Sequence, residues 1–208
     1  MIRRFATSED GAAMVEMTIV STLLFTLVLG FVDFGYALYQ WNAATKAVQI
    51  GARLASISDP IAPEIATAGP TATPGAPVIA GSFAYVCNGA TSTCTCTGAY
   101  CVNGVWTPAN FNRIYAGDDG ICGAVAGSRP GMCDFFPLLQ PANVVVSYTA
   151  TGLGYQTRAT GAVPTITVSL QNVTFQFFFL QGLMGFGNIT MPSMLSTVTG
   201  EDLKSTSP

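Results

Sequence analysis

Histidine is absent from this 208-residue chain, and charged residues of either sign are scarce. Only 9% of the residues are charged, far below the usual quarter. The sequence contains no Gly-x-x-x-x-Gly-Lys phosphate loop, no Gly-x-Ser-x-Gly nucleophile elbow and only two lysines. These absences argue against an enzyme, so we expect no catalytic residues and no cofactor.

Basic residues are also too few and too scattered to form a nucleic-acid-binding surface. Eight Lys and Arg stand against eleven Asp and Glu, which gives a net charge of −3. The charges balance up to Leu54, so the whole net charge belongs to the rest of the chain. We therefore expect no nucleic-acid partner. A surface with so few charges suits packing within an assembly.

A long apolar run is present instead, at residues 11–32 with the sequence GAAMVEMTIVSTLLFTLVLGFV. Sixteen residues between Glu16 and Asp33 carry no charge, and the apolar flanks bring the segment close to the roughly 20 residues that a membrane-spanning helix needs. Arg3 and Arg4 precede it, which predicts a cytoplasmic N-terminus and an exported C-terminal part. A cleaved secretory signal fits less well, because no small-x-small site closes the run.

Glu16 is the informative residue of this run, because a carboxylate at the head of a membrane helix is costly unless it is paired. Cleavage after Gly11 would give Ala12 a free ammonium and make Glu16 the fifth residue. The ammonium of a neighbouring subunit would then be the natural partner of the Glu16 carboxylate. Gly11 and Ala12 are the expected processing site and Glu16 the expected assembly residue. The alternative is that Glu16 lies at the headgroup level of an ordinary membrane-anchored protein.

At these residues the chain resembles prepilins of the type IV class, whose peptidase cleaves after Gly in a Gly-x-x-x-x-Glu context. The basic leader, GAAMVE, the apolar run and VDFGYALYQWNAATKAVQIGARLAS are similar to the TadE-like minor pilins of the tight-adherence (Tad/Flp) pilus machinery. The segments PTITVSLQNVTF and NITMPSMLSTVTGED resemble the closing strands of that family. Met17 departs from the major Flp pilins, which often carry Tyr after the Glu.

The resemblance implies a minor pilin or pseudopilin in the inner membrane, with a cytoplasmic N-terminus and a periplasmic C-terminal domain. Its expected partners are the prepilin peptidase, other minor pilins, the major Flp pilin and the inner-membrane pilus platform. Two other hypotheses remain: an unprocessed, single-pass, membrane-anchored binding module, and an adhesin at a pilus tip. Whether the protein enters the fibre or stays in a membrane complex is left open.

One helix is predicted over residues 12–57, after a leader at 1–11, because neither proline nor a turn cluster appears before Pro60. Its second half has apolar and small residues at helical spacing beside a polar stripe of Asn42, Lys46, Gln49 and Arg53. One face is expected to pack on the exported domain and another to meet neighbouring subunits, unless all of it packs on its own domain.

Asp33 marks the outer membrane boundary or pairs with a basic residue of a partner. The aromatic residues Tyr36, Tyr39 and Trp41 follow it, as in an interfacial belt.

Residues 58–80 contain five prolines and are predicted to be an extended, surface-exposed linker or loop. All six cysteines lie beyond it, in an insert at residues 87–133. Their even number on the exported side predicts three disulfides, with 15 possible connectivities. A zinc site is the alternative, disfavoured by the lack of histidine, so we expect no metal. The cysteines are Cys87, Cys94, Cys96, Cys101, Cys122 and Cys133.

The exported region 81–208 is expected to be β-rich. Strands are predicted at residues 143–150, 165–179 and 188–199, with shorter ones in GSFAYVC, AYCVNGVW and FNRIY. The segment FFFLQGLMGF at 177–186 is either buried or an exposed patch for partners or the membrane surface. The fold class is α+β: a long N-terminal transmembrane helix packed on a small antiparallel β-sheet domain with a disulfide-rich insert, as in pilins.

Overall fold

The computed structural model describes residues 9–69, 73–123, 128–156, 161–185, 187, 189–200 and 203. Two compact units divide the chain. The first combines Met1–Gln40 with Thr174–Ile189, and the second combines Trp41–Val173 with Thr190–Pro208. Arg3 and Arg4 of the expected leader lie outside the described residues. A long helix and an antiparallel sheet confirm the predicted α+β class.

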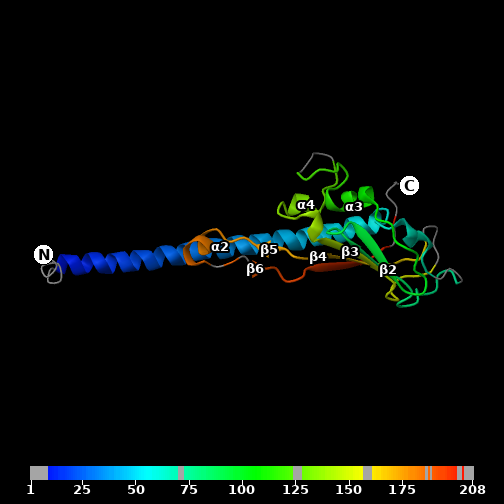
Figure 1. Cartoon of the computed structure of the whole chain (residues 1–208), viewed down its shortest axis with the longest axis horizontal. Helices are drawn as coiled ribbons and strands as arrows, with labels where there is room; N and C mark the ends of the chain where they lie inside the picture. Colours follow the sequence, from blue (N-terminus) through cyan, green and yellow to red (C-terminus); the bar gives the residue numbers. More distant parts are fainter. Residues whose placement is uncertain are drawn as a thin grey trace. The chain divides into compact units, whose positions relative to one another are not determined.

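Helix α2 runs without interruption over Glu9–Ile57 and contributes to both units (Figure 1). It contains no proline, and Pro60 follows shortly after its end. The hydroxyls of Thr18, Thr22 and Thr26 each donate a hydrogen bond to the carbonyl oxygen four residues earlier, at 2.8, 2.7 and 2.8 Å respectively. These bonds satisfy the polar side chains of the apolar run within the helix itself, as a helix in lipid requires.

The second unit is built around an antiparallel sheet of five strands in the order β2-β1-β3-β4-β7. A separate pair, β5 and β6, forms a two-stranded sheet. Along β3 and β4, buried residues alternate with half-buried ones, because successive side chains of a strand point to opposite faces. The buried row of β4 includes Ile166, Val168 and Leu170. The strands are β1 (Ala84–Asn88), β2 (Thr93–Thr97), β3 (Val144–Thr149), β4 (Thr165–Leu170), β5 (Thr174–Phe175), β6 (Ile189–Thr190) and β7 (Leu195–Thr199).

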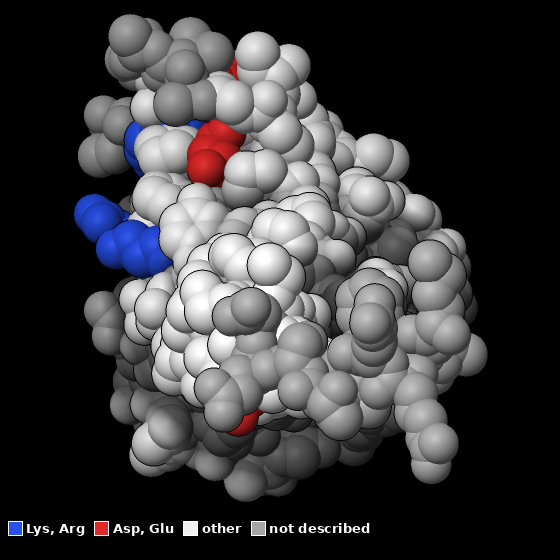
Figure 2. Space-filling model, turned by 90° about the vertical axis from the view of Figure 1, so that its left-hand side faces the viewer, with Lys and Arg blue, Asp and Glu red and all other residues white. Residues whose placement is uncertain are grey.

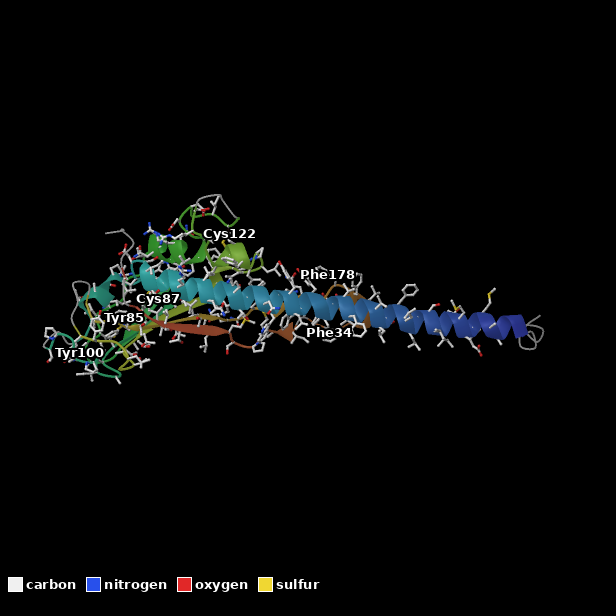
Figure 3. All side chains as sticks on the ribbon, turned by 180° about the vertical axis from the view of Figure 1, so that it is seen from behind. Phe34, Tyr85, Cys87, Tyr100, Cys122 and Phe178 are labelled. Atoms are coloured by element: carbon white, nitrogen blue, oxygen red, sulfur yellow. A yellow bond between two sulfur atoms is a disulfide. The ribbon has the colours of Figure 1, made fainter. Side chains whose placement is uncertain are left out.

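The C-terminal part of α2 belongs to the core of this second unit. Figures 1 and 3 show the sheet on one side of it and two short helices, α3 (Pro108–Tyr115) and α4 (Met132–Phe135), on the other. A Cβ at Gly51 would lie 2.5 Å from the Met132 sulfur, so this glycine permits the close approach of α4. The predicted polar stripe of α2 is exposed. The buried residues of α2 here include Ala44, Ala47, Val48, Ala52, Leu54 and Ala55.

Two predicted strands are wrong, because the segment FNRIY forms part of α3 and AYCVNGVW contains no strand. Pro108 stands in the first turn of α3, where its fixed φ suits a helix. Phe111 and Ile114 are buried three residues apart, which is a helical rather than a strand spacing. A short apolar segment can match both the helical and the strand spacing, and Pro108 favours the helix here.

The predicted strand at residues 165–179 is too long. β4 ends at Leu170, β5 is confined to Thr174–Phe175, and helix α5 follows at Phe179–Met184. Asn172 adopts a positive φ of 54°, which strands do not accommodate. The third predicted strand is also divided, into β6 and β7 around Pro192, with Asn188 outside the described residues.

Residues 58–80 are less exposed than predicted. They contain the 3-10 helix η1 (Pro63–Thr67), and Ile61, Ile65 and Val78 are buried. The cysteine region is likewise no separate irregular insert, since β1 and β2 are two strands of the main sheet. Another 3-10 helix, η2 (Pro141–Asn143), precedes β3. Apolar side chains between the prolines are buried, which the high proline content alone did not indicate.

Tyr148 of β3 links the proline-rich segment to the sheet. Its ring is fully buried, and its hydroxyl accepts a hydrogen bond from the backbone N–H of Ile61 at 3.3 Å. Burial raises the pKa of Tyr148, because an apolar interior disfavours the phenolate. The hydroxyl therefore stays neutral and holds the start of the segment against the sheet.

Tyr148→Phe is expected to lower the free energy of unfolding by about 1–3 kcal/mol, because the buried Ile61 N–H loses its acceptor. Denaturant unfolding of the full chain in detergent, followed by near-ultraviolet circular dichroism, measures this change. Tyr100→Phe removes a hydroxyl from an exposed ring and serves as the matched control. Equal stability of the two variants would contradict the role assigned to Tyr148.

Candidate assembly site

The predicted processing and assembly residues lie on the first described turns of α2. Gly11, Ala12 and Glu16 are all helical, and Ala12 and Glu16 are four residues apart and exposed. Residues four apart lie on the same face of a helix. The predicted new N-terminus and the Glu16 carboxylate therefore lie on one side of an exposed helix.

Glu16 has no hydrogen bond or ion pair within the part of the chain that the structure describes. The next acidic residue of α2 is Asp33, which lies about 25 Å further along at roughly 1.5 Å per residue. Apolar side chains surround Glu16, and the neighbouring Met14 and Met17 are largely exposed. The described residues thus leave the Glu16 carboxylate exposed and uncompensated.

The apolar face around Glu16 is long enough and apolar enough for α2 to cross a membrane. None of its most hydrophobic window is buried by the rest of the described chain. In Figure 2 charged side chains are few on the visible surface, and most of that surface is uncharged. This helix has the length and composition of a membrane anchor, and its surface is exposed in the described chain.

Asp33 has surroundings that differ from those of Glu16. It is 1% exposed, and its carboxylate accepts three backbone hydrogen bonds. Oδ1 accepts from the N–H of Phe178 at 3.1 Å, and Oδ2 accepts from Phe179 at 2.9 Å and Leu180 at 2.7 Å. These N–H groups open helix α5 and have no partner within it. Asp33 therefore caps α5, and no basic partner is needed to compensate it.

Gln40 makes a second connection to the same segment and is fully buried. Its Nε2 donates to the carbonyl oxygen of Gln176 at 3.2 Å, and its Oε1 accepts from the N–H of Gln176 at 3.3 Å. Asp33, Ala37 and Gln40 are all buried, with the spacing i, i+4 and i+7 of one helix face. Sequence reasoning missed this site, although two polar residues on one face of an apolar helix are a readable signal.

Aromatic contacts surround these polar connections. The rings of Phe34 and Phe177 lie 6.3 Å apart in an edge-to-face arrangement, and those of Tyr36 and Phe178 lie 5.0 Å apart. Figure 3 shows Phe34 and Phe178 at the same level of α2. The segment at 177–186 is thus partly packed and partly exposed: Phe177 is buried and Phe178 is exposed. Phe186 lies outside the described residues.

The six cysteines form the three predicted disulfides, and none of them is free. Cys87 and Cys94 are opposite each other in the β1–β2 hairpin, which places their Cα atoms 4.0 Å apart. Cys96–Cys101 ties the end of β2 to the following loop, and Cys122–Cys133 ties a loop to α4. Each cysteine pairs with a near neighbour in sequence.

A cleft with a volume of about 480 Å³ lies beside α3 in the second unit. Trp106, Phe111 and Tyr115 line it as a row of rings, with centroids 4.7 Å and 5.9 Å apart along the row. The Tyr115 hydroxyl donates to the carbonyl oxygen of Leu139 at 2.8 Å, which fixes that ring. No group of three or more metal-ligating side chains occurs among the described residues.

Comparison with known proteins identifies the N-terminal part of the chain. Residues 11–53 match the family model described as TadE-like protein, which confirms the resemblance inferred from GAAMVE and the helix that follows it. The similarity expected in the closing strands lies beyond the matched residues. No curated protein and no solved structure gave a significant match to the chain.

The three disulfides are expected to differ in their rates of reduction, because thiolate attack requires access to a sulfur atom. Cys122 is exposed and Cys96 and Cys101 are half-buried, whereas Cys87 is fully buried and Cys94 is 8% exposed. Mild reductant without denaturant should open Cys122–Cys133 first and Cys87–Cys94 last. Alkylation at successive times with peptide mass mapping gives the order. Early labelling of Cys87 would show that the hairpin opens more readily than its burial indicates.

Proposed function

We propose that this chain, which matches the TadE-like family over residues 11–53, is a minor pilin or pseudopilin of a Tad pilus system that acts through assembly and not through catalysis. Its leader would be removed after Gly11, and the mature protein would take part in building or initiating the pilus. The observation that carries the proposal is Glu16, an exposed carboxylate without a partner among the described residues of an apolar helix. Its five-residue distance from Gly11 suits a prepilin peptidase.

The proposed assembly contact is an ion pair between two subunits. The ammonium of Ala12 on one subunit would meet the Glu16 carboxylate of its neighbour, and each charge would compensate the other in an apolar bundle. A buried carboxylate left alone is strongly unfavourable, so the pair selects one register between neighbouring helices. Exposed apolar side chains on both sides of Glu16 supply the area for helix packing.

We further propose that α2 anchors the protein in the inner membrane with its N-terminus in the cytoplasm and the disulfide-bonded unit in the periplasm. Arg3 and Arg4 before the span support this orientation, and disulfides support an oxidising compartment. The proposed partners are the prepilin peptidase, other minor pilins, the major Flp pilin and the inner-membrane platform.

The aromatic cleft beside α3 favours a second candidate, an unprocessed membrane-anchored binding module. Concave sites lined by aromatic rings with a few polar groups are common ligand sites. The mature N-terminus distinguishes the two: Ala12 supports the pilin route, and Met1 supports the anchored module. A pilus-tip adhesin would combine processing with the cleft and would be found on sheared fibres.

Gly11→Val is expected to leave the leader attached, because a bulky residue at the cut blocks a peptidase that requires glycine. Intact mass measurement of protein from a host with the cognate peptidase reports the mature terminus. Gly30→Val is the matched control, since a Cβ at Gly30 meets nothing within 4 Å. A Gly11→Val protein with the same mature N-terminus as the wild type would contradict the cleavage site.

Glu16→Ala is expected to be cleaved normally but to abolish or strongly reduce piliation, because the Ala12 ammonium loses its partner. Glu16→Gln keeps the shape without the charge and should behave in the same way. Met17→Leu changes the adjacent exposed side chain and should assemble normally. Counts of fibres by electron microscopy measure piliation. Normal piliation of Glu16→Gln would show that assembly does not need the ion pair.

A further inference from the structure

The pilus proposal does not explain the exposed aromatic surface where the described residues 174–185 pack on α2. We propose that this segment lies within the bilayer interface, where it shields Asp33 and extends the membrane-embedded length of α2. We call it the interfacial segment. The inference depends only on the proposal that α2 is a membrane anchor. It holds whether or not the leader is cleaved or a pilus is formed.

The first argument is length. The uncharged run from Met17 to Val32 has 16 residues, which makes about 24 Å of helix, whereas the hydrocarbon core is about 30 Å thick. Continuing through Asp33 to Tyr39 gives 23 residues, or about 35 Å, which is enough to cross. A span that begins after Glu16 therefore includes the turns that contain Asp33, and a bare carboxylate there would oppose insertion.

The second argument is that the polar groups at this level are satisfied internally. Both Asp33 oxygens are bonded to N–H groups of the interfacial segment, and both ends of the Gln40 amide are bonded to Gln176. Such internal satisfaction is what a low-dielectric environment demands, and water would not require it. The carboxylate and the amide are therefore buried and do not face the lipid or water around the helix.

The third argument is the chemistry of the outer surface. The interfacial segment contains no charged residue. Phe178 is 61% exposed, and Phe34, whose ring lies 6.3 Å from that of Phe177, is 60% exposed. Phe31, Phe34 and Leu38 are all exposed and have the i, i+3 and i+7 spacing of one helix face. The exposed Tyr39 stacks on Tyr36, which contacts Phe178. An uncharged, aromatic-rich surface continuous with a membrane span matches the boundary between headgroups and acyl chains.

A bilayer suits this surface better than a specific protein partner. The surface offers no charge and no unpaired amide or carboxylate from Asp33 or Gln40 by which a partner could be oriented. Tyr36 is half-buried against Phe178, and Tyr39 is exposed beside it, so hydroxyl-bearing rings stand at the level where headgroups begin. The alternative occupant, a second copy of the chain, is an outcome of the test below.

The test places a tryptophan in the interfacial segment of the full-length protein. Phe178→Trp is made in a Trp41→Phe, Trp106→Phe background and reconstituted into vesicles of phosphatidylethanolamine and phosphatidylglycerol that contain lipids brominated along their acyl chains. We expect blue-shifted emission, loss of fluorescence to bromines placed near the headgroup, and no quenching by aqueous iodide. Leu153→Trp, at an exposed position of the second unit, should show the reverse.

Asp33→Ala, added to the Phe178→Trp protein, tests the capping contact, because it leaves the N–H groups that open α5 without their acceptor. The emission of the introduced tryptophan should shift to the red and become accessible to iodide. Glu16→Ala is the matched control, since it removes a carboxylate from the same helix without touching the interfacial segment. An unchanged tryptophan signal after Asp33→Ala would overturn the capping role.

Two results would overturn the membrane placement itself. Iodide quenching of the introduced tryptophan, with Asp33 intact, would show that water covers the surface. Protection from iodide without any quenching by brominated lipid, and only at high ratios of protein to lipid, would show that a second copy covers it. Both results are independent of leader removal and of fibre formation, so they leave the proposed pilus function untouched.

Discussion

The uninterrupted backbone hydrogen bonding of α2, from Glu9 to Ile57, is the constraint on which the rest of the structure depends. Only a helix satisfies every interior N–H and C=O within a single segment, so one helix can serve in two different surroundings. Its first part carries apolar side chains outward, and its last part packs small side chains into the second unit. The change occurs near Gln40, without a break in the hydrogen bonds.

Three acidic or amide side chains of α2 show how context sets their roles. Asp33 and Gln40 are buried and bonded to backbone groups of the chain itself, whereas Glu16 is exposed and has no partner in the described structure. The energetic reason is the same in each case, because an uncompensated carboxylate or amide is costly in an apolar environment. Asp33 and Gln40 are compensated by hydrogen bonds within the fold. For Glu16 the proposed compensation is an ion pair with another subunit.

The second unit is held together by several independent means. Its sheet buries an alternating row of apolar residues, and Tyr148 fixes the proline-rich segment that follows α2. Three disulfides close short loops around this core, so they restrain the surface more than they define the fold. The aromatic cleft beside α3 lies on the surface of this unit.

The sequence by itself determined the long helix and its end, since the absence of proline before Pro60 and the helical spacing of small residues are local signals. It also determined where strands β3 and β4 lie, the disulfide bonding of the cysteines and the TadE-like segment around Gly11 and Glu16. Each of these follows from periodicity, spacing or composition within a short stretch.

Tertiary structure alone decided the features that join distant parts of the chain. The cysteine-bearing hairpin became part of the main sheet. The segment after β5 folded onto α2 and did not continue as a strand, because the carboxylate of Asp33 supplies acceptors for its first N–H groups. About 145 residues separate these groups in sequence, so no local pattern encodes their contact. Long-range hydrogen bonds of this kind are set by the fold and not by propensity.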